Sequence, residues 1–417
     1  MRLLTFVERD DPVSKVAAVS ILVLHTRYRT TGGEERAVED LAWLAREHLD
    51  EDVELLTRDS TALGRATAAR GLLGGGLDPG AVTGAIRRTG ADVVHAHNLP
   101  PTFGWRALAA ARAAGAGTVL HLHNYRLVCA VATCVDLAGD DCTRCHGRNT
   151  APGLVKGCRG SRAEGAVYAV ALAGWQRRLV AHADVIVVPS QAAADRLRQL
   201  GAPVGAPHVV PHVVRSAAPV AGTAARRHDP GGPALVASRL APEKGVDVAI
   251  AACAQAGVGL VVAGDGPQAQ FLMALARDTY GLTVLEGTDP SPPGPGQVRF
   301  TGLLDTGALD LLRAAASVEI VPSRAHETFG LAAVEALAAG LPVVASAVGA
   351  LAALPPPVRL VAAGDVGALA AALPGARADG AAAASGPDLA RALAGPEIVA
   401  PALRAVYATA RRARSAR

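Results

Sequence analysis

The sequence predicts two α/β domains in tandem, each built on a doubly wound parallel sheet. Three observations support this fold class. Short runs rich in valine, isoleucine and leucine recur along the chain, alanine-rich amphipathic segments separate them, and a stretch with neither pattern lies near the middle. Continuous apolar runs separated by helices are typical of parallel strands buried on both faces. The length of 417 residues suits two large domains.

In the first half, Ser190 is the expected N-cap of a helix over 190–199, and a second amphipathic helix is expected over 34–48. The strands of this half are expected at 19–24, 53–56, 93–96, 118–122, 185–188 and 208–210. The alternation of strand and helix predicts an N-terminal Rossmann-like domain over 1–214.

The second half repeats this alternation, with a helix expected over 246–256. Its strands are expected at 234–237, 259–262, 298–300, 318–321, 343–345 and 358–361. A linker over 215–232, rich in Ala, Gly, Pro and Arg, precedes a second Rossmann-like domain over 233–395. We expect the last segment, 396–417, to form a helix that packs back on the N-terminal domain.

Composition excludes several kinds of partner. The chain has 41 Lys and Arg against 37 Asp and Glu, a net charge of +4, and 3% aromatic residues. Nucleic-acid binding usually needs a stronger basic bias or more aromatic platforms. Charges near the start argue against a secretory leader, and glycines and prolines break the longest uncharged stretch, 336–358. We expect a cytoplasmic protein without a transmembrane segment; peripheral membrane contact through the basic C-terminal run stays open.

Two basic residues follow the first strand of the second half. Arg239 offers a planar fork for phosphate oxygens, and Lys244, one of three lysines in the chain, offers a compact charge. Open α/β sheets bind ligands beyond the carboxyl ends of their strands. The position favours a diphosphate clamp over an ordinary solvated loop.

Two carboxylates follow a later strand. Glu327 precedes the start of a helix and Glu335 lies about two turns further on, so both can face the same cleft. Helix capping would explain Glu327 alone. It does not explain Glu335 on an otherwise apolar helix, where a carboxylate must find donors such as sugar hydroxyls.

Glycine-rich turns are weaker signals. Gly32 and Gly33 open a helix shortly after the first strand, where backbone amides can approach an anion. The turn Ala263-Gly264-Asp265-Gly266-Pro267 resembles part of the dinucleotide fingerprint but lacks its third glycine.

The glutamate pair, following Pro322-Ser323 and separated by Thr-Phe-Gly-Leu, resembles the signature of retaining glycosyltransferases of family GT4, or group 1. Further matches are Arg239 to Gly245, Gly264 to Pro267, Phe300-Thr301-Gly302, Gly32-Gly33-Glu34, His95-Ala96-His97-Asn98 and His121-Leu122-His123-Asn124. The resemblance extends from about residue 19 to the final helix. It implies the GT-B fold, in which two Rossmann-like domains face a central cleft.

The resemblance also implies residue roles. Arg239 and Lys244 would neutralise the donor diphosphate and the departing nucleotide. Glu335 would bind the ribose hydroxyls, Glu327 the hydroxyls of the transferred sugar, and His123 would lie near the reacting centre. The remaining donor-binding positions would be Gly33, Gly264, Gly302, Phe329, Gly330 and Leu331. Such enzymes typically need no metal for catalysis, and their front-face attack does not make Glu327 a nucleophile.

Five of the six cysteines lie in an insert at about 125–160. Cys142 and Cys145 have metal-ligand spacing, and Cys129 and Cys158 flank them almost symmetrically, while Cys134 is the fifth. A reducing cytosol favours zinc over disulfides. A structural zinc, free thiols and disulfides all stay open. The insert resembles a cysteine-bearing segment of some GT4 subgroups, although Ala130 stands where proline is common.

The sequence thus predicts a retaining hexosyltransferase that moves a sugar from a UDP- or GDP-sugar to an acceptor hydroxyl. The acceptor would bind to the first domain and the nucleotide-sugar to the second. The charge balance favours a saccharide or small natural product over a membrane lipid. Two alternatives are a sugar-nucleotide epimerase of the same fold and a non-catalytic nucleotide-sugar-binding protein. Intact Arg239, Lys244, Glu327 and Glu335 argue against the latter.

Overall fold

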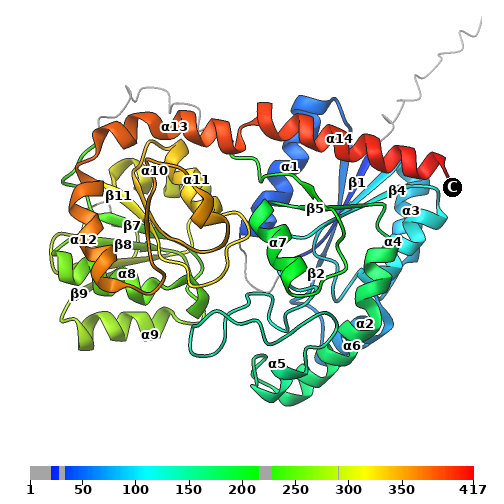
Figure 1. Ribbon diagram of the computed structural model, residues 1–417, viewed down its shortest axis with the longest axis horizontal. Helices are drawn as coiled ribbons and strands as arrows, with labels where there is room; N and C mark the ends of the chain where they lie inside the picture. The colour runs from blue at the N-terminus through cyan, green and yellow to red at the C-terminus, as the bar shows by residue number, and fades with distance from the viewer. Residues whose placement is uncertain (1–19, 28–32, 216–227, 290) are drawn as a thin grey trace, which may run out of the picture.

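The computed structural model describes residues 20–27, 33–215, 228–289 and 291–417. Two α/β domains follow one another, and in each of them helices cover both faces of a parallel sheet (Figure 1). The predicted fold class is therefore confirmed. The strands are parallel, and helices rather than hairpins connect most of them; β9 and β10 are joined by a loop.

The N-terminal sheet has the order β2-β1-β3-β4-β5-β6. Its strands are β1 (Ile21–Arg27), β2 (Val53–Asp59), β3 (Val93–Ala96), β4 (Gly117–His121), β5 (Val185–Val188) and β6 (His208–Val209). The helices of this half are α1 (Gly33–Leu49), α2 (Arg65–Gly74), α3 (Gly80–Thr89), α4 (Gly104–Ala113), α5 (Ala151–Val155), α6 (Arg162–Ala181) and α7 (Gln191–Gln199). Ser190 caps α7 by accepting a hydrogen bond from the Ala193 amide at 3.0 Å, as predicted.

The C-terminal sheet has the order β13-β12-β11-β7-β8-β10-β9. Its strands are β7 (Ala234–Ala237), β8 (Leu260–Ala263), β9 (Thr283–Glu286), β10 (Gln297–Gly302), β11 (Val318–Val321), β12 (Val343–Ser346) and β13 (Arg359–Val361). Its α-helices are α8 (Val246–Ala256), α9 (Ala269–Ala274), α10 (Thr306–Ala315), α11 (Leu331–Ala338), α12 (Val366–Arg377) and α13 (Gly380–Ala394). Short 3-10 turns span Pro242–Lys244 (η1) and Gly349–Ala353 (η3), and a π-helical turn, η2, spans Leu275–Thr279.

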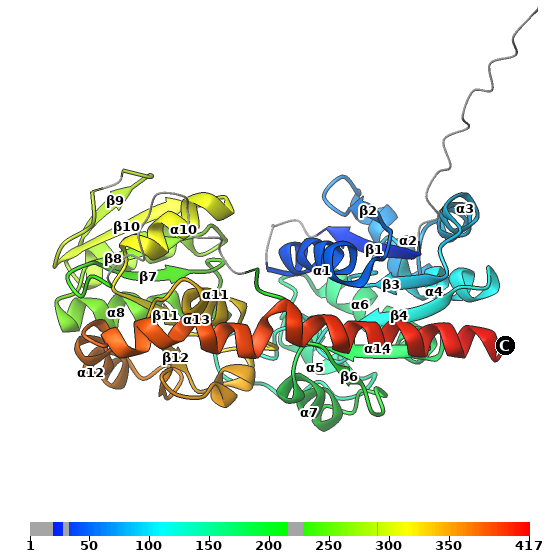
Figure 2. The ribbon, with the colours of Figure 1, turned by 90° about the horizontal axis from the view of Figure 1, so that it is seen from above.

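The last helix, α14 (Pro396–Ser415), returns from the second domain to the first and runs along its sheet (Figure 2). Leu403, Val406 and Tyr407 are fully or almost fully buried in the same core as strands β1, β3, β4 and β5. Arg411 pairs with Glu51 at 2.7 Å and with Asp92 at 2.9 Å. The N-terminal core is therefore completed by the end of the chain.

Two sequence expectations need comment. Strand β9 was not predicted, because Thr283–Glu286 is an edge strand with exposed ends and carries no continuous apolar run. Residue 19, the glycine at position 32 and most of the expected linker (216–227) lie outside the described residues. In the described part of the chain, no helix is long and apolar enough to cross a membrane.

Candidate active site

The loops after β7, β8 and β10 pack closely because of their glycines. A Cβ on Gly264, whose φ is +139°, would lie 1.9 Å from the Ser238 carbonyl oxygen, and a Cβ on Gly266 would lie 2.4 Å from the Leu240 oxygen. The Gly264 amide donates to the Gly302 oxygen at 2.9 Å. Gly264, a predicted donor-binding residue, thus lies against the turn that carries Arg239, and Gly302, also predicted, lies against Gly264.

The turn from Arg239 to Gly245 holds the two predicted basic residues at this sheet edge. Arg239 forms an ion pair with Glu243, which is nearly buried. Gly245 has φ +65°, and a Cβ there would lie 2.1 Å from the Pro322 oxygen. Only glycine therefore allows this turn to pack against the loop that contains Glu327.

Lys244 and Glu327 meet across these loops. The Lys244 Nζ lies 2.6 Å from Glu327 Oε1, and the Ser323 hydroxyl lies 2.6 Å from the same oxygen. Burial alone would raise the pKa of Glu327, but the Lys244 ammonium and the Ser323 hydroxyl outweigh it and lower that pKa. The carboxylate is thus held ionised and fixed in orientation.

The loop around Glu327 is also fixed through its backbone. The Ala350 amide donates to the backbone carbonyl oxygen of Glu327 at 2.8 Å, and a Cβ added to Gly349 would lie 2.3 Å from that carbonyl oxygen. The Arg324 and Ala325 amides donate to the Glu243 carbonyl oxygen at 2.9 and 3.1 Å. The Arg239 turn and the Glu327 loop therefore form one rigid unit.

Glu335 lies on α11 in a network of buried charges. Arg313, on α10, is 2.9 Å from Glu335 Oε2 and 3.0 Å from Glu319 Oε2. Arg36, on α1 of the other domain, lies 3.1 Å from Glu335 Oε1. We expected hydrogen-bond donors around this carboxylate, and in the structure they are the guanidinium groups of Arg36 and Arg313.

On the N-terminal side, six histidines gather at the carboxyl ends of β1, β3, β4 and the segment after β6. They are His25, His95, His97, His121, His123 and His212. The His97 Nδ1 lies 2.7 Å from the His123 Nε2, and the His95 Nδ1 lies 3.0 Å from the Tyr407 hydroxyl. Burial lowers the pKa of both His97 and His123 well below the usual value, so both rings are neutral at pH 7.

Five of these rings are stacked rather than arranged around a point, and the His25 ring lies edge-on to His97. The ligand atoms of His95, His97 and His121 lie within 4.8 Å of one another, as do those of His121, His123 and His212. However, the His121 and His123 rings are 15° from parallel, and the His95 and His121 rings are 9° from parallel. A metal needs lone pairs that lie in the ring planes and converge, which near-parallel stacked rings do not provide.

The two domains meet at these groups. The Thr328 hydroxyl donates to the His123 carbonyl oxygen at 3.0 Å, so His123 lies beside the residue that follows Glu327. The Phe329 ring contacts the His212 ring with centroids 5.1 Å apart. A Cβ on Gly33 would lie 3.7 Å from the Leu331 side chain. The structure therefore brings together most of the predicted site residues from both halves of the chain.

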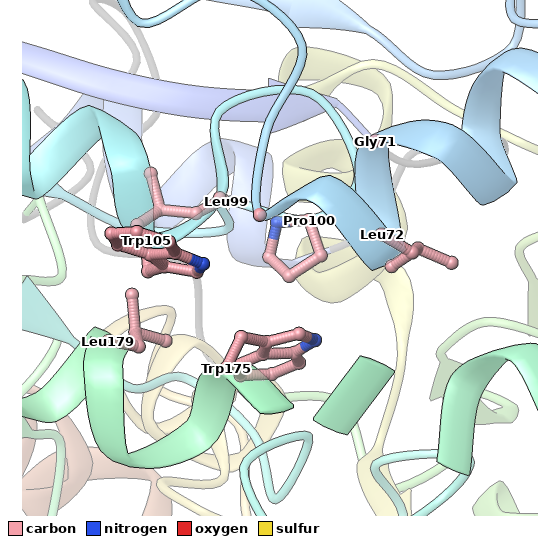
Figure 3. Close-up of a pocket in the computed structure, with 9 residues that line it drawn as sticks. Gly71, Leu72, Leu99, Pro100, Trp105, Trp175 and Leu179 are labelled. Carbon is pink, nitrogen blue, oxygen red and sulfur yellow. The ribbon is translucent and has the colours of Figure 1, made fainter. Parts of the chain in front are cut away.

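Beside the histidines, the N-terminal domain has an apolar pocket lined by Trp105, Trp175, Leu72, Leu99, Pro100 and Leu179 (Figure 3). Trp175, Leu99, Pro100 and Leu179 also line a second pocket, which reaches His97 and His123. The two pockets thus share a wall and lie next to the predicted reacting centre.

Several residues that contact the predicted site were missed in the sequence. Arg36, Arg313 and Ser323 were not singled out, although they hold Glu335 and Glu327. A signal existed for Arg313, because Glu319 lies within an otherwise apolar strand and requires a cation nearby. The four cysteines predicted as possible zinc ligands line one cavity together with Cys134; they are Cys129, Cys142, Cys145 and Cys158. None of the six cysteines forms a disulfide in the structure.

The fold and these sites define a two-domain glycosyltransferase architecture. Residues 233–378 match the family model described as glycosyl transferases group 1, and residues 18–213 match the glycosyl transferase 4-like domain. Together these ranges cover most of the chain. The protein belongs to the group 1 glycosyltransferases, family GT4.

Known proteins agree with this assignment. The chain is 40% identical over 127 residues to glycogen synthase of Mycobacterium tuberculosis, a match that covers 29% of this chain and 27% of that protein. The fold resembles sucrose-phosphate synthase from Thermosynechococcus elongatus (TM-score 0.66, 20% identity, 93% of this chain and 98% of that one). It also resembles Anabaena HepE in complex with UDP and glucose (TM-score 0.58, 19% identity, 93% and 98%).

Proposed function

We propose that the protein is a retaining glycosyltransferase that moves a sugar from a UDP- or GDP-sugar to the hydroxyl of a saccharide or small natural product. The observation that carries this proposal is the Lys244–Glu327 pair, which the Thr328–His123 contact links to the histidines of the other domain. This places a cation and an ionised carboxylate where the two domains meet. Related proteins that bind UDP and glucose on this fold support a nucleotide-sugar donor.

The basic residues act on the diphosphate in this proposal. Arg239 and Lys244 have side chains 38% and 28% exposed, so both can reach a ligand while Glu243 and Glu327 hold them in place. Their charge stabilises the nucleotide diphosphate as its bond to the sugar breaks. Phe329 and the amides of the loop through Gly330 and Leu331 would line the same donor site, with Gly33 facing it from the other domain.

Glu335 binds the ribose hydroxyls of the donor. Its carboxylate faces Arg36 across the domain boundary. Donor binding would replace this contact with hydroxyl donors, while Arg313 keeps its ion pair with the carboxylate on the buried side. Exchange of Arg36 for the ribose would couple donor binding to the relative position of the two domains.

Glu327 binds hydroxyls of the transferred sugar and does not attack it. One of its oxygens already accepts hydrogen bonds from Lys244 and Ser323, which lowers its nucleophilicity and fixes its direction. Retention would follow from attack of the acceptor hydroxyl on the face that the nucleotide leaves, with the leaving phosphate oxygen taking the acceptor proton. His123, neutral and fixed by His97, would position the sugar at the reacting centre without gaining a proton.

The acceptor would bind in the N-terminal domain, beside the histidines. The pocket that reaches His97 and His123 is also lined by Asn98 and Asn124 and shares Trp175 with the apolar pocket beside it. The acceptor hydroxyl would enter there, next to the reacting centre.

Two measurements test this proposal. Melting curves with UDP, GDP and dTDP should show a rise with one nucleotide, about 2.7 kcal/mol of added stability at 100 times its dissociation constant. With that donor and an acceptor found by screening, NMR of the product should show the anomeric configuration of the donor. An inverted product would contradict the retaining assignment, and no shift with any nucleotide would contradict donor binding.

A further inference from the structure

The cysteine-bearing insert contains one cavity surrounded by thiols. Its walls include Cys129, Cys134, Cys142, Cys145 and Cys158. These residues come from separate turns spread over thirty positions, and the sixth cysteine, Cys253, is buried in α8 of the other domain. Such convergence of thiols from distant turns is typical of a metal site and is not needed for apolar packing alone.

The segment that forms the cavity has little regular structure of its own. Between β4 and α6, the described residues form one five-residue helix, α5, and two isolated bridges, Val135 with Asp141 and His146 with Asn149. Ordering one residue costs roughly 1–2 kcal/mol of conformational entropy. A segment of this length with so little regular structure is often stabilised by a metal or by disulfides, which offset that cost.

We propose that Cys129, Cys142, Cys145 and Cys158 bind one structural zinc ion, and that Cys134, which lines the same cavity, is not a ligand. Cys142 and Cys145 have the two-residue spacing of a zinc-binding turn.

The charge around the cavity suits a four-thiolate site. Zinc with four thiolates carries a net charge of −2, and Arg144 and Lys156 line the same cavity. Arg159 donates to the Ala130 carbonyl oxygen at 2.8 Å, beside Cys129. Arg144 and Arg159 already pair with Asp136 and Glu164, so Lys156 would contribute most of the charge that offsets the bound metal site.

The thiols surround the cavity more widely than a bound ion requires. Zinc–sulfur bonds of about 2.3 Å place neighbouring sulfurs about 3.8 Å apart. Among the residues that the structure describes, only histidines have three ligand atoms within 4.8 Å of one another. We infer that the turns carrying Cys142, Cys145 and Cys158, whose side chains are partly exposed, close on the ion when it binds.

A metal here would also act on the contact between the domains. Tyr125, at the start of the insert, has its hydroxyl 3.0 Å from Nδ1 of His326, the residue before Glu327. Gly139 lies against Arg324, which pairs with Asp247 at 2.6 Å in the donor domain. The ion would therefore hold the insert in the position from which it contacts the Glu327 loop. This second consequence rests on the proposed function, whereas the metal assignment does not.

Metal analysis of protein purified without chelator tests the assignment. We expect about one zinc per chain in the wild type and at least a tenfold lower content in the Cys142→Ser/Cys145→Ser variant. Cys253→Ser and Cys134→Ser are the controls, and both should keep the wild-type content. Protein refolded with Co²⁺ should show the visible absorption of a tetrahedral thiolate site, which the double variant should lack.

Three results would overturn the assignment. The first is wild-type protein that contains no zinc and lacks the Co²⁺ absorption. The second is a protein mass that is lower than that of the reduced chain and shows disulfides among the five cysteines. The third is a zinc loss in Cys134→Ser as large as that in Cys142→Ser/Cys145→Ser. If the double variant fails to fold, the Co²⁺ spectrum of the full-length wild type still tests whether the thiols bind a metal.

The effect of the metal on the contact between the domains has its own test. Zinc removal should lower the melting temperature and raise the donor KM, and an unchanged donor KM in metal-free protein would contradict this effect.

Discussion

Replacing Lys244 by alanine should abolish most of the activity while leaving most of the protein folded. The substitution removes the ammonium 2.6 Å from Glu327 Oε1. It also removes the compact charge that faces the leaving diphosphate in the proposed mechanism. Loss of one preorganised donor at a developing charge lowers kcat by about 10²–10³-fold, which corresponds to about 2.7–4 kcal/mol.

The same substitution has a separate effect on stability. Without Lys244, burial is the main influence on Glu327, and the pKa of this carboxyl should rise because its chief stabilising charge is gone. Both side chains keep some exposure, 28% and 15%, so we expect a loss of about 1–3 kcal/mol in the free energy of unfolding, less than for a fully buried pair.

A double substitution separates the two effects. Lys244→Ala/Glu327→Gln removes the uncompensated charge, so its melting temperature should lie above that of Lys244→Ala while its activity stays low. The assay is nucleotide release with the preferred donor, at a temperature where each variant is folded. If Lys244→Ala loses less than about threefold in kcat/KM, the diphosphate role of Lys244 is wrong.

Three further changes have defined outcomes. Glu335→Gln should raise the donor KM about tenfold with little change in kcat, because it weakens ribose binding; Glu286→Gln, on the exposed edge strand, is the control in the same kinetic assay. Leu403→Ala in α14 should lower the free energy of unfolding by about 2–5 kcal/mol in denaturant titration, and equal loss in exposed Leu311→Ala would contradict this. His95, with a pKa of about 3, and His212, with a pKa of about 4, bind protons more weakly in the folded protein than in the unfolded chain, as do His97, His121 and His123. The free energy of unfolding should therefore keep its full value above about pH 6.5. As the pH drops toward 4, each of these histidines should lower it by up to about 1.4 kcal/mol per pH unit; a free energy of unfolding that does not change with pH would contradict their burial.

The sequence was sufficient for the fold because its strands are buried on both faces. Runs such as Val318–Val321 and Leu260–Ala263 are buried throughout, and short continuous apolar runs between helices are a strong sequence signal for such strands. Strand β9 has exposed ends and lies at the sheet edge, where selection for apolar residues is weak. Its absence from the prediction follows from that weak signal.

The site was predictable where residues lie close in sequence to a motif. Arg239, Lys244, Glu327 and Glu335 follow strand ends within recognisable turns. Their partners were not predictable, because Arg36 and Glu335 are brought together only by the packing of two domains. The same holds for the link between Thr328 and His123, which are 205 positions apart.

Nucleotide release from UDP-, GDP- and dTDP-sugars without acceptor tests the central claim most directly. The variants are Arg239→Ala, which loses the proposed diphosphate clamp, and Arg277→Ala, which removes an exposed arginine of the same domain as a control. The account predicts slow release from one donor by the wild type and by Arg277→Ala, and none by Arg239→Ala. Release that is equal in all three proteins would contradict the assignment of the donor site.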